Sequence, residues 1–203
     1  MTEKNKYRII NIRRYIGNEN PELGEDELLQ ILSEFSCPKN PEIEDFVRSK
    51  AIDFAKRKLS ITYLVFNDDD GLVGDLAGIF TLTHKALEIK DEVLTNTARK
   101  TVQRYAKLDT GSGSYLVSAF LLAQFGKNYA AQNGMAGNDL MDEALEMLKG
   151  VQHLIGGGVV YLDCENHQKL LSFYKNENNR FREFSSRFDE TENIEYIQLM
   201  RFL

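Results

Sequence analysis

The chain has 203 residues, of which 42% are hydrophobic and 28% are charged, and its formal net charge is −6. These values are typical of one soluble globular domain and exclude a disordered chain. The acidic total disfavours general binding to nucleic-acid backbones, and two cysteines with three histidines at no metal-ligand spacing predict no metal site.

Neither the N-terminus nor any later segment has the composition of a targeting or membrane segment. The first residues lack the apolar core of a signal peptide. No apolar run approaches the ~20 residues that a membrane-spanning helix needs. We therefore expect a cytoplasmic protein without membrane contact, in which Cys164 is a buried structural thiol.

Residues 1–60 are expected to be mainly helical. Residues 1–24 are polar around Ile9 and Ile10, which fits a strand or a loop. Apolar residues spaced three and four apart predict a helix at Glu25–Phe35. Asn40 followed by Pro41 predicts the N-cap of a second helix that runs to about Lys58. Its polar side carries bases at Lys50–Lys58.

The next segment is expected to form a hairpin followed by an insertion. Ile61–Phe66 and Val73–Leu82 are rich in β-branched and aromatic residues and predict paired strands around the turn Asn67–Gly71. Thr83–Ile89 is expected to continue the sheet. Residues 91–107 predict an exposed helix or a mobile insertion that carries further bases, and residues 110–114 predict a flexible connection.

The stretch from Tyr115 to Tyr174 combines a strand, a glycine-bearing turn and a helix, followed by a second strand and helix. The first helix is expected to begin at the turn and end at about Gln152, with an apolar stripe. A helix N-terminus after such a turn holds anions, because its first N–H groups and its dipole face the ligand. The predicted elements are the strand Tyr115–Gly126, the turn Gln132–Gly137, the strand Val159–Cys164, a short helix with Phe173 and Tyr174, and the last strands Phe181–Phe188 and Ile194–Leu203.

This order of elements resembles the GNAT superfamily of N-acetyltransferases. The turn Gln132-x-x-Met135-x-Gly137 is similar to the family's Arg/Gln-x-x-Gly-x-Gly/Ala turn. Phe173-Tyr174 with Phe181 is similar to its Phe-Tyr-x-x-x-Gly-Phe segment. The resemblance covers about residues 61–203. It implies an α+β fold with a mixed, mostly antiparallel sheet of about six to seven strands, flanked by helices and preceded by extra N-terminal helices.

The resemblance also implies a single domain over residues 1–203, with a variable helical part at 1–60 and an acetyl-CoA-binding core at 115–176. Acetyl-CoA is the implied cosubstrate. Tyr174 matches the family's general acid, which protonates the departing CoA thiolate. Backbone N–H groups near Gly126 would polarise the thioester carbonyl. The implied cofactor-binding residues are Phe125, Gly126, Lys127, Gln132, Asn133, Gly134, Met135, Ala136, Gly137, Asn138, His167 and Phe173.

Several residues depart from the family pattern. Met135 replaces the first glycine of the turn, and acidic residues such as Asp139 crowd the helix start, where Lys127 is expected to offset them. Glycines at 134 and 137 are expected to allow φ > 0 and close approach of the pyrophosphate. His167 stands where the family often has Asn. The general base is not fixed by the sequence, and His84 is one candidate.

The leading hypothesis is an N-acetyltransferase in which an acceptor amine attacks acetyl-CoA directly in a ternary complex. The acceptor is a small molecule, a protein or an aminoacyl-tRNA, and the last would make the protein a GNAT toxin. The bases at Lys50–Lys58 and Arg99–Lys107 would then contact the tRNA. A second hypothesis is a non-catalytic CoA-binding or interaction module, and a homodimer is left open. A dinucleotide-binding fold is disfavoured because no Gly-x-Gly-x-x-Gly motif is present.

Overall fold

The computed structural model describes residues 6–16, 24–69, 72–191 and 193–203. It divides into two compact units. Three elements pass through both of them, namely strand β3 (Leu72–Lys90), strand β5 (Ser114–Lys127) and helix α5 (Gly137–Ile155). Unit 1 comprises Met1–Thr83 and Ala123–Glu143, and unit 2 comprises His84–Leu122 and Ala144–Leu203.

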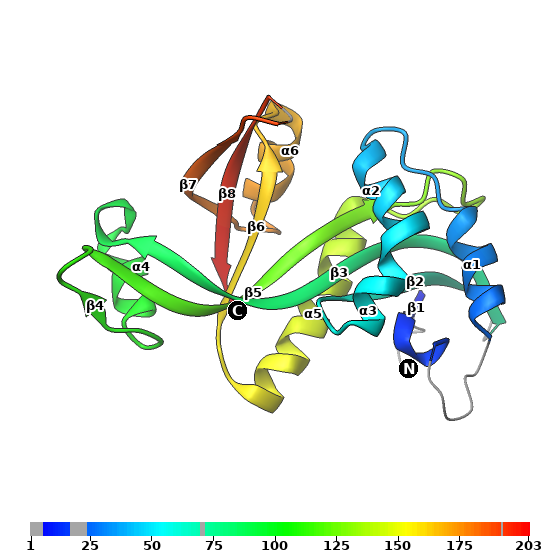
Figure 1. The fold of residues 1–203 in the computed structure, drawn as a ribbon, viewed down its shortest axis with the longest axis horizontal. Coiled ribbons are helices and arrows are strands. Elements are labelled where there is room, and N and C mark those ends of the chain that lie inside the picture. Colours follow the sequence, from blue (N-terminus) through cyan, green and yellow to red (C-terminus); the bar gives the residue numbers. More distant parts are fainter. Residues whose placement is uncertain (1–5, 17–23, 70–71, 192) are drawn as a thin grey trace. The chain divides into compact units, whose positions relative to one another are not determined.

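Unit 1 contains the N-terminal helices and the first strands of the sheet (Figure 1). Strand β1 is antiparallel to β2, and β2 is antiparallel to β3, as the sequence predicts for the hairpin. Strand β2 extends through Asp69, which pairs with Leu72, so Asn67–Asp69 belong to a strand and not to a turn. The elements are β1 (Tyr7–Asn11), η1 (Ile12–Arg14), α1 (Glu25–Ser33), α2 (Pro41–Asp45), η2 (Phe46–Lys50), α3 (Ala51–Lys56), β2 (Ile61–Asp69) and β3 (Leu72–Lys90).

The second N-terminal helix begins as the sequence predicts and then departs from the prediction. The side chain of Asn40 accepts a hydrogen bond from the Ile43 N–H, and Pro41 is the first helical residue. The predicted continuous helix is instead α2, a π-helical turn (η2) and α3. A π turn holds one residue more than an α turn. Val47 and Ala51 are both fully buried across this turn.

Helices α1–α3 cover one face of β1–β3 in unit 1 (Figure 1). Successive side chains of a strand point to opposite faces, and Ile79 of β3 belongs to the core beneath these helices. Its neighbour Gly78 therefore points to the other face. A Cβ at Gly78 would lie 3.2 Å from Leu140 Cδ2. The start of α5 thus lies across the second face of β3, where glycine allows close contact.

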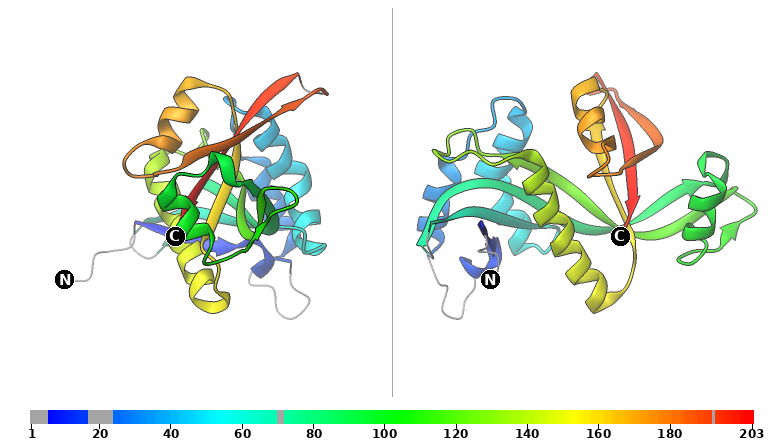
Figure 2. Two further views of the ribbon diagram at one scale, coloured as in Figure 1. Left: turned by 90° about the vertical axis from the view of Figure 1, so that its left-hand side faces the viewer. Right: turned by 180° about the vertical axis from the view of Figure 1, so that it is seen from behind.

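Unit 2 contains the rest of β3 and β5, with strands β6–β8 and helices α4 and α6. Strands β5 and β6 are parallel, with Phe120 opposite Val160 and Leu121 opposite Tyr161. Strand β8 pairs antiparallel with both β6 and β7. Helix α6 lies against β6 (Figure 2). The elements are η3 (Asp91–Val93), α4 (Asn96–Val102), β4 (Leu108–Asp109), β5 (Ser114–Lys127), α5 (Gly137–Ile155), β6 (Val159–Glu165), α6 (Gln168–Lys175), β7 (Arg182–Asp189) and β8 (Ile194–Phe202).

The insertion between β3 and β5 is more ordered than the sequence predicts. The predicted helix over residues 91–107 is a 3-10 turn followed by α4, which Thr95 caps by accepting the Ala98 N–H. The predicted flexible connection at 110–114 is instead a tight turn. In it Gly113 has φ +68° and Asp109 accepts the Gly111 N–H, so β4 pairs with the start of β5.

The sheet order is β1-β2-β3-β5-β6-β8-β7, with β4 paired to β5. The expected mixed, mostly antiparallel sheet with extra N-terminal helices is confirmed. Within the described part of the chain the sheet has eight strands, one more than the upper prediction, because the two-residue β4 is counted. Among the residues described, no helix is long and apolar enough to span a membrane.

Candidate active site

The predicted pyrophosphate turn lies in unit 1, between β5 and α5. Gln132–Ala136 form an irregular loop, and Gly137 and Asn138 are the first residues of α5. The backbone N–H of Gln132 donates to Asp75 Oδ2 at 3.1 Å, and Asn67 Nδ2 donates to the Asn133 carbonyl at 3.0 Å. Side chains of β2 and β3 therefore hold the turn against the sheet at both of its first residues.

Met135 and Gly134 explain how the turn departs from the family pattern. The Met135 side chain is buried, with 3% exposed. It fills the core, so it need not obstruct the exposed side of the turn. Gly134 does not have the positive φ expected from the sequence, and a Cβ there would meet nothing within 4 Å. Gly134 therefore leaves open space beside the backbone and is not required by the fold.

The acidic start of α5 is neutralised from β1 and not from β5. Asp139 accepts hydrogen bonds from Lys6 Nζ and from the Tyr7 hydroxyl, both at 2.8 Å. These bonds lower the pKa of Asp139, with Lys6 as the larger cause. Lys127 was expected to offset this charge, but its ammonium lies over the Tyr129 ring, 5.4 Å from the centroid. No local pattern signals the Lys6–Asp139 pair, because 133 positions separate the two residues.

The end of β5 carries Phe125, Gly126 and Lys127. Gly126 is buried, and a Cβ there would lie 2.9 Å from Ile43 Cγ2, closer than real Cβ contacts. The close approach of Ile43 in helix α2 therefore requires glycine at this position, independently of any role in binding a cofactor. Strand pairing of β5 with β6 involves Phe120 and Leu121. Phe125, Gly126 and Lys127 lie beyond these paired residues, at the end of β5. The sequence predicts that their backbone N–H groups face a thioester.

Asn128, which no sequence pattern singled out, connects this strand end to two other segments of unit 1 and to the loop that follows it. Its Oδ1 accepts from the N–H groups of Ser36 and Ala130, and its Nδ2 donates to the Leu76 carbonyl. Its own N–H donates to the Ala77 carbonyl at 2.9 Å. Only 7% of Asn128 is exposed. Its side chain therefore fixes the chain between β5 and the turn.

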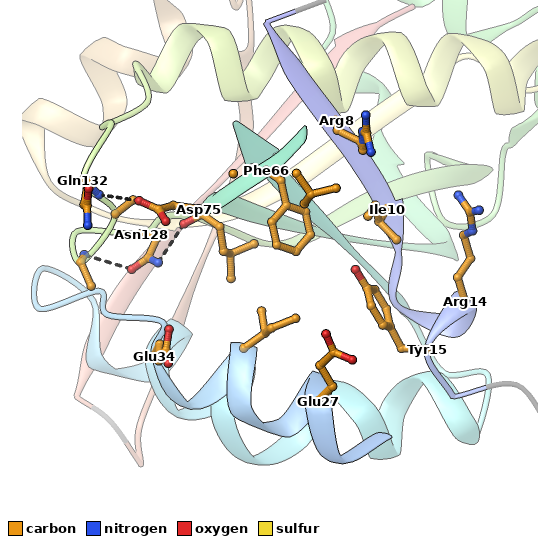
Figure 3. A pocket seen from close by; sticks show the side chains of 16 residues that line it. Arg8, Ile10, Arg14, Tyr15, Glu27, Glu34, Phe66, Asp75, Asn128 and Gln132 are labelled. Atoms are coloured by element: carbon orange, nitrogen blue, oxygen red, sulfur yellow. Dashed lines mark hydrogen bonds between the residues drawn. The ribbon is translucent and has the colours of Figure 1, made fainter. Parts of the chain in front are cut away.

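A cavity of about 740 Å³ lies in unit 1 beside the turn (Figure 3). Arg8 and Arg14 line one side, and Asp75, Glu34 and Glu27 supply acidic groups. Figure 3 shows the side chains of Tyr15 and Glu27 pointing into the cavity. The cavity wall includes Gln132, so it borders the first residue of the turn.

Tyr174, the predicted acid, lies in unit 2 on α6 and is buried, with 8% exposed. Its ring makes edge-to-face contacts with Phe173 and Phe181, with centroids 5.1 Å and 5.9 Å apart. Burial raises the pKa of the Tyr174 phenol well above its usual range, and the Cys164 thiol adds to this effect. A phenol is already protonated at neutral pH, as a proton donor must be, and this shift extends the protonated range to higher pH.

The segment after Tyr174 keeps the ring in place without the family's glycine. The Phe181 N–H donates to the Tyr174 carbonyl at 3.0 Å, and Asn179 Nδ2 donates to the Phe173 carbonyl at 2.8 Å. Arg180, which stands before Phe181, has φ +55°. This is the left-handed conformation for which glycine is favoured. An arginine thus adopts a conformation for which glycine is favoured, directly before Phe181.

Two histidines of unit 2 have structural contacts. His167 is the N-cap of α6, where its Nδ1 accepts from the Lys169 N–H at 3.3 Å. The candidate base His84 is exposed; its Nε2 lies 2.8 Å from Ser118 Oγ, and its ring contacts Phe120. Among the residues that the structure describes, no group of acidic, cysteine and histidine side chains could hold a metal ion.

Solved structures of bacterial toxins share this arrangement. AtaT complexed with acetyl-methionyl-tRNAfMet matches with a TM-score of 0.63 and 13% identity, over 97% of this chain and 94% of that chain. A mutant of KacT matches with a TM-score of 0.61 and 14% identity, over 97% and 95%. AtaTR bound with AcCoA matches with a TM-score of 0.56 and 12% identity, over 98% and 94%.

The chain has the GNAT fold. At these identities the likeness establishes the fold and leaves the activity to be proposed. No protein-family model and no curated protein matches the sequence. Within the GNAT fold, β5, the turn and α5 stand where the sequence placed the cofactor segment, and α6 carries Tyr174 as expected.

Gly134 offers a test of the GNAT turn that leaves the protein's own packing intact. We expect Gly134→Ala to raise the Kd for acetyl-CoA about tenfold, or ~1.4 kcal/mol, because the new methyl group occupies the space into which a pyrophosphate would come. Isothermal titration calorimetry measures this change. Gly150→Ala is the matched control, because a Cβ there also meets nothing within 4 Å. Equal affinities for both variants would show that no ligand approaches Gly134.

Proposed function

We propose that the protein is an N-acetyltransferase that transfers the acetyl group of acetyl-CoA to an amine. The observation that carries this proposal is the position of the buried Tyr174 on α6 of a GNAT fold. The backbone of this segment is held by hydrogen bonds from Asn179 and Phe181 to the carbonyls of Phe173 and Tyr174.

The residues of unit 1 fit the phosphates of acetyl-CoA. The N-terminus of α5 supplies N–H groups, Gly134 leaves open space, and Lys6 and Tyr7 engage the Asp139 carboxylate that would otherwise repel an anion. Bound acetyl-CoA supplies an activated acetyl group on a thioester. The acceptor nitrogen forms the new C–N bond as the C–S bond breaks and loses one proton to water. The Tyr174 phenol gives its proton to the departing thiolate and then regains one from solvent.

Among amine acceptors, an aminoacyl-tRNA is the one that the comparisons favour. The AtaT structure contains acetyl-methionyl-tRNAfMet, whose amino group already carries an acetyl group. This match extends over nearly the whole of both chains. On this proposal the protein acetylates the α-amino group of the amino acid on a charged tRNA, and acts as a toxin by removing charged tRNA from use.

Two departures from the family pattern would favour the non-catalytic alternative, namely Met135 in the turn and the acidic residues at the start of α5. Met135 replaces a glycine, but its side chain lies in the core. At the acidic helix start, Lys6 pairs with Asp139. The first departure therefore leaves the turn clear for a phosphorylated cosubstrate, and the second is reduced by one charge.

The test is acetyl transfer from acetyl-CoA to a panel of amines, measured as release of free CoA thiol. The panel contains charged elongator and initiator tRNAs, the corresponding free amino acids, peptides and polyamines. We expect release with at least one charged tRNA and none with the same tRNA unacylated. If acetyl-CoA stabilises the protein against heat but no amine in the panel causes release of thiol, the result would support a non-catalytic CoA-binding module instead.

A further inference from the structure

The two basic segments that the sequence singled out differ in the structure. In the first, Lys50 pairs with Asp45, Lys56 with Glu25 and Arg57 with Asp53, and the neighbouring Arg48 pairs with Glu44. These pairs are exposed and contribute little to stability, but they cancel positive charge on the surface. The first segment is therefore mostly neutralised, and Lys58, which follows α3, is its one base without an ion pair to the described part of the chain.

The insertion between β3 and β5 in unit 2 is different. Lys100, Arg104 and Lys107 are exposed, and none forms an ion pair with any residue in the described part of the chain. We call these three residues the α4 basic face. Positive charge of this kind is felt over about 8 Å at physiological ionic strength. A local cluster can thus attract an anion even though the whole chain carries a net charge of −6.

Two of the three bases share one side of α4 and the turn that follows it. Helical positions advance by about 100° per residue, so Lys100 and Arg104 lie about 40° apart and opposite Ala98 and Val102. Backbone hydrogen bonds continue the turns of α4 to Ala106, whose N–H donates to the Val102 carbonyl. Ala98 and Val102 are buried against the β3–β5 hairpin. Lys100 and Arg104 therefore point away from the core of unit 2, and the exposed Lys107 follows the last of these turns.

A separate hydrogen-bond network holds α4 in this orientation and pairs the nearby carboxylate of Asp91. Arg99 Nε donates to Asp91 Oδ1 at 2.6 Å, and the Tyr115 hydroxyl donates to the same oxygen at 3.0 Å. The Arg99 guanidinium lowers the pKa of Asp91, so this carboxylate stays ionised and paired. Gln103 Nε2 donates to the Tyr115 hydroxyl. Arg99 is thus structural, whereas the α4 basic face remains available.

Other acids of the insertion are also engaged locally. Glu88 accepts the Ser114 hydroxyl, and Asp109 accepts the Gly111 N–H and the Ser112 hydroxyl. Figure 1 shows α4 and β4 at the end of the β3–β5 hairpin, away from β6–β8 of the same unit. A group of exposed bases at the end of a hairpin suits a phosphate backbone, whose charges repeat along a strand.

We propose that the α4 basic face, formed by Lys100, Arg104 and Lys107, binds the sugar–phosphate backbone of the acceptor RNA. This inference rests on the proposed function in taking that RNA to be the tRNA that carries the amine. The three cations contact phosphates and so position the RNA without reading its sequence. The paired bases of α2–α3, which the sequence offered equally, make no such contribution.

The test measures binding of unacylated tRNA to the full chain by fluorescence anisotropy at several salt concentrations. The triple variant Lys100→Ala/Arg104→Ala/Lys107→Ala should bind at least about tenfold more weakly at about 150 mM salt. The slope of log K against log salt should become shallower by about three, because three phosphates are no longer neutralised by a basic side chain. The matched control Lys50→Ala/Lys56→Ala/Arg57→Ala should stay within about twofold of the parent protein.

Three results would overturn the inference: no tRNA binding by the parent protein, equal weakening in both triple variants, or equally tight binding of a polyglutamate peptide or a DNA duplex. Circular dichroism establishes that both variants are folded. Thermal stabilisation by acetyl-CoA is measured in parallel and should be the same in all three proteins. If acetyl-CoA stabilises none of them while the α4 variant alone fails to bind tRNA, the proposed activity fails and the RNA surface stands.

Discussion

Replacement of Tyr174 by phenylalanine should lower kcat for acetyl transfer by about 10²- to 10³-fold, the usual contribution of a positioned general acid. The substitution removes one oxygen from a buried ring and leaves its contacts with Phe173 and Phe181 in place. The KM for acetyl-CoA should change little, and acetyl-CoA should stabilise the variant against heat as much as it stabilises the parent protein. Steady-state thiol release with the best amine of the panel measures the effect.

The buried phenol also predicts a pH dependence. The pKa of Tyr174 is raised, so the folded protein keeps this proton at pH values where a free tyrosine, with a pKa of 10.0, begins to lose it. Because the acid form is the active form, ionisation of Tyr174 should cause no loss of kcat between about pH 7 and about pH 10. A fall in kcat over this range that is absent from the Tyr174→Phe variant would contradict the proposed protonation state.

A control separates proton donation from packing. Phe173→Leu changes the neighbouring ring but keeps the phenol, and it should reduce kcat far less than Tyr174→Phe. If Tyr174→Phe retains more than half of the parent kcat, Tyr174 is a packing residue. Another group then protonates the thiolate, or the thiolate leaves without a proton.

The order of elements was predictable because it depends on local patterns. Alternating and helical spacing of apolar residues marked β2, α1 and α5, and Asn40 with Pro41 marked the start of α2. These signals lie within a few residues of one another. The π-helical turn at Phe46–Lys50 was missed because it responds to packing, which no local pattern records.

Features of the candidate site were harder to predict when they joined distant segments. The charge of Asp139 was visible in the sequence, but its partner Lys6 is 133 positions away. Lys127, which is close in sequence and was expected to offset this charge, has its ammonium over the Tyr129 ring, and its effect on a bound phosphate stays a prediction. Likewise, composition alone did not distinguish Lys50–Lys58 from Arg99–Lys107, because the pairing of charges depends on tertiary structure. The assignment of Tyr174 as acid and the single-domain boundary remain predictions.

Replacement of Asn128 by alanine should lower the free energy of unfolding by about 2–4 kcal/mol, the largest loss expected from one polar side chain of unit 1. The change leaves the N–H groups of Ser36 and Ala130 and the Leu76 carbonyl without their side-chain partner. Each buried group without its partner costs about 1–3 kcal/mol, and water can reach the exposed Ala130 at lower cost.

Urea unfolding followed by far-UV circular dichroism measures this loss. The matched control is Asn178→Ala, an exposed asparagine whose replacement should change stability by less than about 0.5 kcal/mol. Since Asn128 joins the end of β5 to the segment before the turn, the variant should also bind acetyl-CoA more weakly than the control. If both variants unfold at the same urea concentration, the hydrogen bonds of Asn128 contribute nothing net. The turn would then owe its position to Asp75 and Asn67, which hold Gln132 and Asn133 from the neighbouring strands.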